Sequence, residues 1–169
     1  AAALAGEVPV GAVVLCGAEV VARAQNRMVR DVDATSHAEL LVLRDAARTL
    51  GAARLTECTL VVTLEPCAMC AGTQYWANIG RLVYGMDEQR LLQFTGNHPE
   101  NATLDLPSRQ VFAAGQKGIR VWGPIAEVEA EIEATVAAAR AALADLGVEV
   151  DAVVVAGGAA LRPGDLIVS

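Results

Sequence analysis

The chain has 169 residues, of which 54% are hydrophobic and 20% charged, and its formal net charge is −7. This length fits one domain with a substantial core, and the composition is globular, which excludes an intrinsically disordered chain. No apolar run reaches the roughly 18 residues that cross a bilayer, and the opening Ala1–Ala5 lacks the basic start of a secretory signal, so we expect a cytoplasmic protein.

The first half of the chain predicts a hairpin, a helix and a buried strand. Val8–Leu15 is nearly continuously apolar, Gly17 marks a turn, and Glu19–Ala24 is a second extended stretch. Apolar residues recur at helical spacing over His37–Leu50, where a glycine ends the pattern. Thr59–Leu64 is β-branched and apolar, which is typical of a buried strand.

The second half continues the alternation of helices and strands. Pro66 suits the first position of a helix that we extend to about Asn78, and Arg81–Tyr84 predicts a short strand. Polar and helix-breaking residues accumulate over 86–109, which we interpret as a long loop forming one wall of a pocket. Val111–Gln116 predicts a helical turn and Ile119–Trp122 a strand.

The C-terminal part is distinct in composition. Ala126–Leu146 is rich in Ala and Glu and predicts a helix, and the apolar stretch Ala152–Ala156 after it either adds strands or forms a tail. Residues 1–125 hold 11 Lys and Arg against 12 Asp and Glu, a balance of −1, whereas 126–169 hold 2 against 8, a balance of −6. We therefore divide the chain into a core, 1–125, and an acidic helix with its tail, 126–169, packed on the same domain. Strands alternating with helices predict an α/β fold, a three-layer α/β/α sandwich around a mixed five-stranded sheet.

Two short motifs carry the chemistry. His37-Ala38-Glu39 supplies a histidine, and Pro66-Cys67-Ala68-Met69-Cys70 supplies two thiols three residues apart. A histidine and two thiolates suit zinc and leave its fourth tetrahedral position open for water. Glu39, two residues after His37, could move protons to and from that water without binding the metal. The order H-x-E followed by P-C-x-x-C is the signature of zinc-dependent nucleobase deaminases.

Each half of the motif also has a plainer interpretation. Ser36 and Glu39 fit a capping box at a helix start, and Cys67 with Cys70 alone could be a redox pair or half of a structural zinc site. His37 alone could be an ordinary, partly buried histidine. The combined order, spacing and predicted context favour catalytic zinc.

Other residues leave alternatives open. His98, in the polar loop, is either a fourth metal ligand or a surface or pocket-wall residue, and we favour the latter. Cys16 and Cys58 lie in apolar surroundings and are interpreted as buried thiols. The arginines in 23–30 form either a basic rim or ordinary solvated side chains, so charge alone does not exclude an RNA substrate.

Four segments extend the likeness beyond the metal motif: Gly6–Ala12, Asn26, Ala34–Glu39 and Thr63–Gly72. They resemble the cytidine and deoxycytidylate deaminase superfamily, in particular the branch of bacterial tRNA adenosine deaminases, guanine deaminases and related nucleobase or nucleoside deaminases. The likeness covers roughly residues 6–85. It implies a homodimer, with the helix that carries the second zinc motif near its interface.

The resemblance also assigns roles to single residues. It implies that His37, Cys67 and Cys70 hold one zinc ion and that Glu39 shuttles protons. It further implies that the Ala38 backbone and the Asn26 side chain bind the substrate.

This sequence departs from the resemblance at both ends. Relatives begin with an additional helix before the first strand, and the tRNA enzymes end in a basic helix where Ala126–Leu146 is acidic. Our leading hypothesis from sequence is therefore hydrolytic deamination of a free purine or purine nucleoside, with guanine first. The alternative is adenosine-to-inosine editing in tRNA, and a third, non-enzymatic hypothesis is a silent zinc domain for dimerisation. A thiol oxidoreductase would leave His37 and Glu39 without a role.

Overall fold

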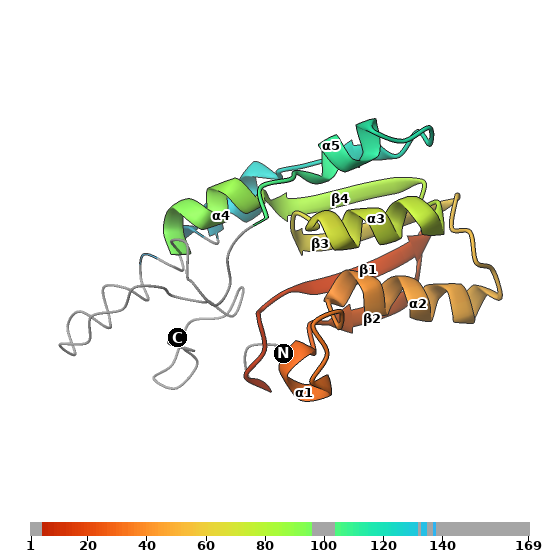
Figure 1. Cartoon of the computed structure of the whole chain (residues 1–169), viewed down its shortest axis with the longest axis horizontal. Coiled ribbons are helices and arrows are strands. Elements are labelled where there is room, and N and C mark those ends of the chain that lie inside the picture. The colour runs from red at the N-terminus through yellow and green to blue at the C-terminus, as the bar shows by residue number, and fades with distance from the viewer. Residues whose placement is uncertain (1–4, 96–103, 132, 135–136, 138–169) are drawn as a thin grey trace.

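The computed structural model describes residues 5–95, 104–131, 133–134 and 137. Its single mixed sheet has five strands: β1 (Gly11–Cys16), β2 (Glu19–Gln25), β3 (Cys58–Leu64), β4 (Arg81–Met86) and β5 (Arg120–Trp122). Their order is β2-β1-β3-β4-β5. β1 is antiparallel to both β2 and β3, whereas β3, β4 and β5 run parallel (Figure 1). The predicted α/β fold with a mixed five-stranded sheet is confirmed.

Besides a helical segment that begins at residue 126, five helices connect or flank the strands in the described part of the chain. They are α1 (Met28–Asp31), α2 (Ala38–Leu50), α3 (Ala68–Ala77), α4 (Glu88–Thr95) and α5 (Ser108–Ala113). α2 and α3 lie next to each other over one face of the sheet (Figure 1). Residues 126–131 are also helical, in agreement with the helix expected from 126; residues 138–169 lie outside the described residues. The division of the chain at 125 stays a prediction.

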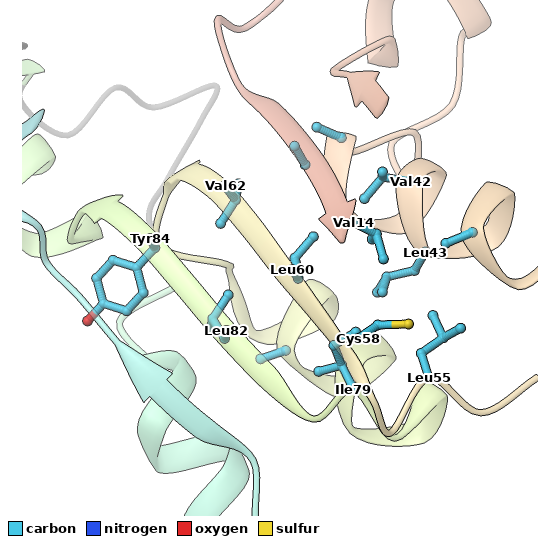
Figure 2. Packing of buried hydrophobic residues seen from close by; sticks show 14 of the residues in the cluster. Val14, Val42, Leu43, Leu55, Cys58, Leu60, Val62, Ile79, Leu82 and Tyr84 are labelled. Atoms are coloured by element: carbon cyan, nitrogen blue, oxygen red, sulfur yellow. The ribbon is translucent and has the colours of Figure 1, made fainter. Parts of the chain in front are cut away.

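The core lies between the sheet and the helices α2 and α3. Alternate residues of a strand point to the same face, and Val14, Leu60 and Leu82 follow one another across β1, β3 and β4 with no exposed surface. They pack with Val42 of α2 in one hydrophobic cluster (Figure 2). Each fully buried Leu or Val of this kind contributes about 1.5–3 kcal/mol to folding. This cluster holds α2 and α3 at fixed positions over the strands.

The opposite face of the sheet is lined by the intervening residues. Val13, Val61 and Val83 are paired across the same three strands and border a hollow of about 680 Å³. Ile125 and Val128 border the same hollow, so in the described part of the chain the C-terminal segment approaches this face.

Several element bounds differ from those expected. β1 begins at Gly11, three residues after the predicted start at Val8, whose side chain is 43% exposed instead of buried. The predicted helix from Pro66 begins after Cys67, its N-cap residue, so Pro66 precedes the helix. α5 begins at Ser108, three residues before the predicted turn.

The loop expected over 86–109 contains a helix, α4. The Asp87 carboxylate accepts a hydrogen bond of 2.6 Å from the backbone N–H of Arg90, which is the bond of an N-cap residue. Asp87 follows β4 directly, so one acidic residue ends the strand and begins the helix. In the described residues, no helix has both the length and the apolar character to cross a bilayer.

The fold directs several segments towards one edge of the sheet. β3 leads into α3 and β4 leads into α4, so the first turns of both helices follow the carboxyl ends of adjacent parallel strands. Ligand sites of α/β sheets are found at this edge. The two predicted motifs meet there.

Candidate metal centre

The two motifs come together at two helix starts. His37 is the N-cap residue of α2 and Cys67 is the N-cap residue of α3, while Cys70 is buried in the first turn of α3. The His37 Nδ1 atom lies 3.8 Å from the Cys67 Sγ and 3.5 Å from the Cys70 Sγ. Within the described residues, these three side chains form the one group that could hold a metal ion, with ligand atoms within 4.8 Å of one another.

The spacing of these atoms fits zinc. A tetrahedral ion with ordinary zinc–nitrogen and zinc–sulfur bond lengths separates a nitrogen ligand from a sulfur ligand by about 3.6 Å. The two nitrogen–sulfur distances, 3.5 and 3.8 Å, bracket that value. The described residues therefore offer three ligands of the expected kind at the expected separation.

The pKa values of the two thiols are shifted in opposite directions. A hydrogen bond from Cys70, assisted by one from His37, lowers the pKa of Cys67 to about 4 although burial opposes this shift. The same hydrogen bond to Cys67, together with burial, raises the pKa of Cys70. The hydrogen bond to Cys67 also raises the pKa of His37. Before a metal binds, one thiolate at Cys67 is thus supported by two donors.

Glu39 lies beside the three ligands and is 4% exposed. Burial raises the pKa of its carboxyl group, and the charge of His37 and a hydrogen bond with Cys70 oppose that rise. The interpretation of Glu39 as part of a capping box is wrong. The N-cap residue is His37 and has no side-chain cap, while the Ser36 hydroxyl donates to Asp33 instead.

The two predicted substrate-binding residues lie close to this centre along the chain. Ala38 is the first residue of α2 and is fully buried. Asn26 is 3% exposed and follows β2, and the neighbouring Arg27 N–H donates to the Ser36 carbonyl at 3.0 Å. This bond places the segment at Asn26 beside the residue that precedes His37. His98 lies outside the described residues, so its suggested role is untested.

Glu88 is a further acidic residue near the centre, and the sequence analysis missed it. Burial, and then the negative charge of Cys67, raise the pKa of Glu88 to about 7. Glu88 is half-buried at the start of α4, in the region expected to form a loop. The available signal was Asp87, the residue between β4 and Glu88, which is suited to begin a helix.

Glu65 stabilises the segment before Cys67. Its carboxylate is 6% exposed and accepts hydrogen bonds from the Ser108 N–H and hydroxyl at 2.9 and 2.7 Å. Its backbone N–H donates to Met86 at 2.8 Å, continuing the pairing of β3 with β4. These bonds tie the segment that carries the thiols to α5 and β4.

Comparisons with known proteins agree with this geometry. Residues 1–101 match the MafB19-like deaminase family. Among curated relatives, the tRNA(Ile)-lysidine synthase of Deinococcus radiodurans is 58% identical over 80 residues, which are 47% of this chain and 14% of that protein. The tRNA-specific adenosine deaminase of Bacillus subtilis is 45% identical over 80 residues, which are 47% of this chain and 50% of that protein. The chain therefore spans half or less of the length of these two relatives.

A solved structure extends the similarity over more of the chain. It comes from a study of A-to-I editing by tRNA:A34 deaminases at the wobble position of transfer RNA. It is 35% identical, has a TM-score of 0.60, and the match covers 76% of this chain and 87% of that one. This match thus covers a larger share of the chain than the 47% covered by each of the two curated relatives.

Proposed function

Since the chain belongs to the MafB19-like deaminase family, we propose that it is a zinc-dependent hydrolase that replaces the exocyclic amine of a purine with a carbonyl oxygen and releases ammonia. The observation that carries this proposal is the position of Glu39. A buried carboxyl group beside three zinc-type ligands suits a proton shuttle, whereas a purely structural zinc site has no use for one.

The roles of the residues follow from this chemistry. His37, Cys67 and Cys70 would hold the zinc ion, which would supply Lewis-acid activation of a water molecule near neutral pH. Glu39 takes one proton from the attacking water and gives it to the ring nitrogen. It then takes the proton of the newly attached hydroxyl group and gives it to the departing amine, which leaves as ammonia while the carbonyl forms. Burial keeps the Glu39 carboxyl group away from bulk water and raises its pKa. The raised pKa helps Glu39 to hold a proton between these steps.

The choice of substrate changes when the relatives are considered. Sequence alone favoured guanine, because the C-terminal part is acidic. The relatives named for tRNA deamination are 45% and 35% identical, so adenosine in a tRNA anticodon arm becomes the first substrate to test. Guanine remains the second candidate, since Arg27 and Arg30, two of the three arginines of the predicted rim, share the Asp31 carboxylate, which reduces the positive charge there.

Binding of the substrate by Asn26 and the Ala38 backbone is part of the proposal. A cytoplasmic location and a homodimer are also part of the proposal. Trp76 on α3, with 76% of its surface exposed, suits a dimer interface. Sedimentation of the purified protein tests the dimer.

The experiment is a substrate panel. Purified zinc-loaded protein is assayed for inosine in a tRNA anticodon arm and for ammonia from guanine, adenosine, cytosine and cytidine. We expect turnover of at least one purine substrate. A folded, zinc-containing protein that is inactive on the whole panel would instead support the silent zinc domain.

Substitution of Glu39 tests the mechanism. Glu39→Gln keeps the side-chain shape but cannot carry the proton, so the rate should fall at least about 100-fold while zinc content is unchanged. Glu57→Gln, which alters an exposed carboxylate, is the matched control and should retain activity. A Glu39→Gln enzyme of ordinary activity contradicts the proposed role.

A further inference from the structure

Outside the metal centre, the most deeply buried carboxylate in the described residues is Glu7, which is 1% exposed. It lies before β1 and accepts three hydrogen bonds. The Asn26 Nδ2 and the Val29 N–H donate to its Oε2, both at 3.2 Å, and the Arg30 N–H donates to its Oε1 at 2.8 Å. A buried charge is costly unless it is bonded in this way, so these three donors fix the position of the carboxylate.

Glu7 also decides which way the Asn26 amide points. Carboxylate oxygens only accept hydrogen bonds, so the Asn26 nitrogen must face Glu7. The reversed amide would bring two oxygens together at the 3.2 Å separation now bridged by a hydrogen. The Asn26 Oδ1 is therefore directed away from Glu7.

The Oδ1 atom of Asn26 is free to accept a bond. It has no hydrogen-bond partner among the described residues. It is also not completely enclosed by the protein, unlike the unpartnered amide atoms of Gln74. The backbone on both sides is fixed: the Asn26 N–H donates to the Val10 carbonyl and the Arg27 N–H to the Ser36 carbonyl, each at 3.0 Å. A rigid acceptor thus lies at the segment beside His37.

We propose that Glu7 is a positioning residue that fixes the Asn26 amide so that its Oδ1 accepts a hydrogen bond from the substrate. The substrate group that contacts Asn26 must then be a donor, such as a ring N–H or a ribose hydroxyl, and a ring nitrogen with only a lone pair is rejected. This inference rests on the proposed deaminase function and on Asn26 as a substrate-binding residue.

A reciprocal exchange of the two side chains tests the proposal. In Glu7→Gln, a single side-chain oxygen must accept the bonds that the two carboxylate oxygens of Glu7 now share, so the Asn26 amide loses its fixed orientation. We expect KM to rise about tenfold with little change in kcat. Asn26→Asp places two carboxylates together and should lower kcat/KM about 100-fold. In the double variant, the nitrogen of the introduced amide can donate to the introduced carboxylate, whose other oxygen still accepts from the substrate. We expect it to recover at least about tenfold of the Asn26→Asp loss.

Controls separate positioning from stability. Thermal unfolding and zinc content are measured for every variant, and Glu19→Gln changes an exposed carboxylate on β2 as the matched control. If Glu7 served only to hold the chain near α1, the double variant would be at least as impaired as Asn26→Asp. That result overturns the proposal.

A spectroscopic measurement does not depend on turnover. The side-chain NH₂ signal of Asn26, identified by its loss in Asn26→Asp, should have one proton shifted and protected by the bond to Glu7. In Glu7→Gln it should move or split into two signals. An unchanged signal contradicts the proposal even if activity falls. If the wild-type protein deaminates nothing, the proposed function fails, and this spectrum still decides whether Glu7 orients the amide.

Discussion

Cys67 and Cys70 occupy the same turn of α3, but their environments make them chemically different. Cys67 receives hydrogen bonds that stabilise its thiolate, and its pKa falls to about 4. Cys58, in the core, shows the opposite case: burial, with a hydrogen bond involving Cys16, raises its pKa to about 11. These values give the cysteines distinct reactivities in the metal-free protein.

We predict that alkylation of chelator-treated protein distinguishes these thiols. Above about pH 4 Cys67 is a thiolate, so its labelling rate should be constant between pH 6 and 8. Cys58 is a thiol until about pH 11 and its rate should rise about tenfold per pH unit. Cys67 should still react faster at pH 7, by about tenfold or more, although a low pKa also weakens its nucleophilicity.

Peptide mapping by mass spectrometry measures each rate, and added zinc should protect Cys67 and Cys70 but not Cys16. Equal labelling of all four cysteines, or labelling of Cys67 that zinc does not slow, contradicts the assignment.

The motif residues were predictable because each has a distinctive side chain at a fixed spacing. His37, Cys67 and Cys70 are brought together as expected. Glu88 was missed because its relevance depends on α4, whose start is marked locally by the single capping residue Asp87 in an otherwise polar stretch. The burial of Gln74, whose amide has no partner in the described residues, was equally unpredictable, since a polar residue on a helix normally faces water.

At the scale of elements, α1 and α3 end with the same backbone conformation but with residues of different tolerance for it. Both helices end in a left-handed residue, Val32 with φ of 49° and Asn78 with φ of 55°. Asparagine tolerates this conformation, whereas a β-branched residue is strained in it by about 1–2 kcal/mol. Val32 is 91% exposed and has no packing that would offset the strain.

We therefore predict that Val32→Asn stabilises the protein by about 1 kcal/mol and that Asn78→Val destabilises it by a similar amount. The free energy of unfolding in urea measures both. Changes of the same sign would show that side-chain contacts, and not the backbone, dominate at these positions.

Elements with a clear hydrophobic pattern, such as α2, β3 and β4, were easier to predict than α1 and α4. β3 is rich in β-branched residues, and β4 begins with alternating half-buried and buried residues, so both agree with the prediction to within two residues. α1 has only four residues and no buried side chain, so it leaves no periodic signal. α4 was missed because weight was given to polar composition instead of to the single capping residue, Asp87.

At the scale of the whole molecule, the C-terminal segment is held against the rest by close contacts. Arg90 of α4 pairs with Glu133 at 2.7 Å and with Glu129 at 3.6 Å. The backbone of Gly85 lies close to Val128 and Thr63. A Cβ atom added to Gly85 would be 2.6 Å from the Val128 Cγ1 and 2.6 Å from the Thr63 carbonyl oxygen.

We predict that Gly85→Ala destabilises the protein by about 1–3 kcal/mol, because the added methyl group forces the C-terminal segment or β3 to move. Gly72→Ala is the matched control. Gly72 lies within α3 with open space around it, so alanine should stabilise that helix by about 0.5–1 kcal/mol. Calorimetry of both variants checks the contrast, and a Gly85→Ala protein as stable as the wild type would contradict the close packing.

The reversal of strand direction at β3 has a consequence for how this scaffold diversifies. The three candidate ligands stand at the starts of α2 and α3, whereas the flanks are supplied by the stretch before β1 and by α4. Under the proposed function, these flanks can change without altering the three ligands. A lineage can lengthen, shorten or replace either flank, and so accept a different amine, while inheriting the reactive machinery unaltered.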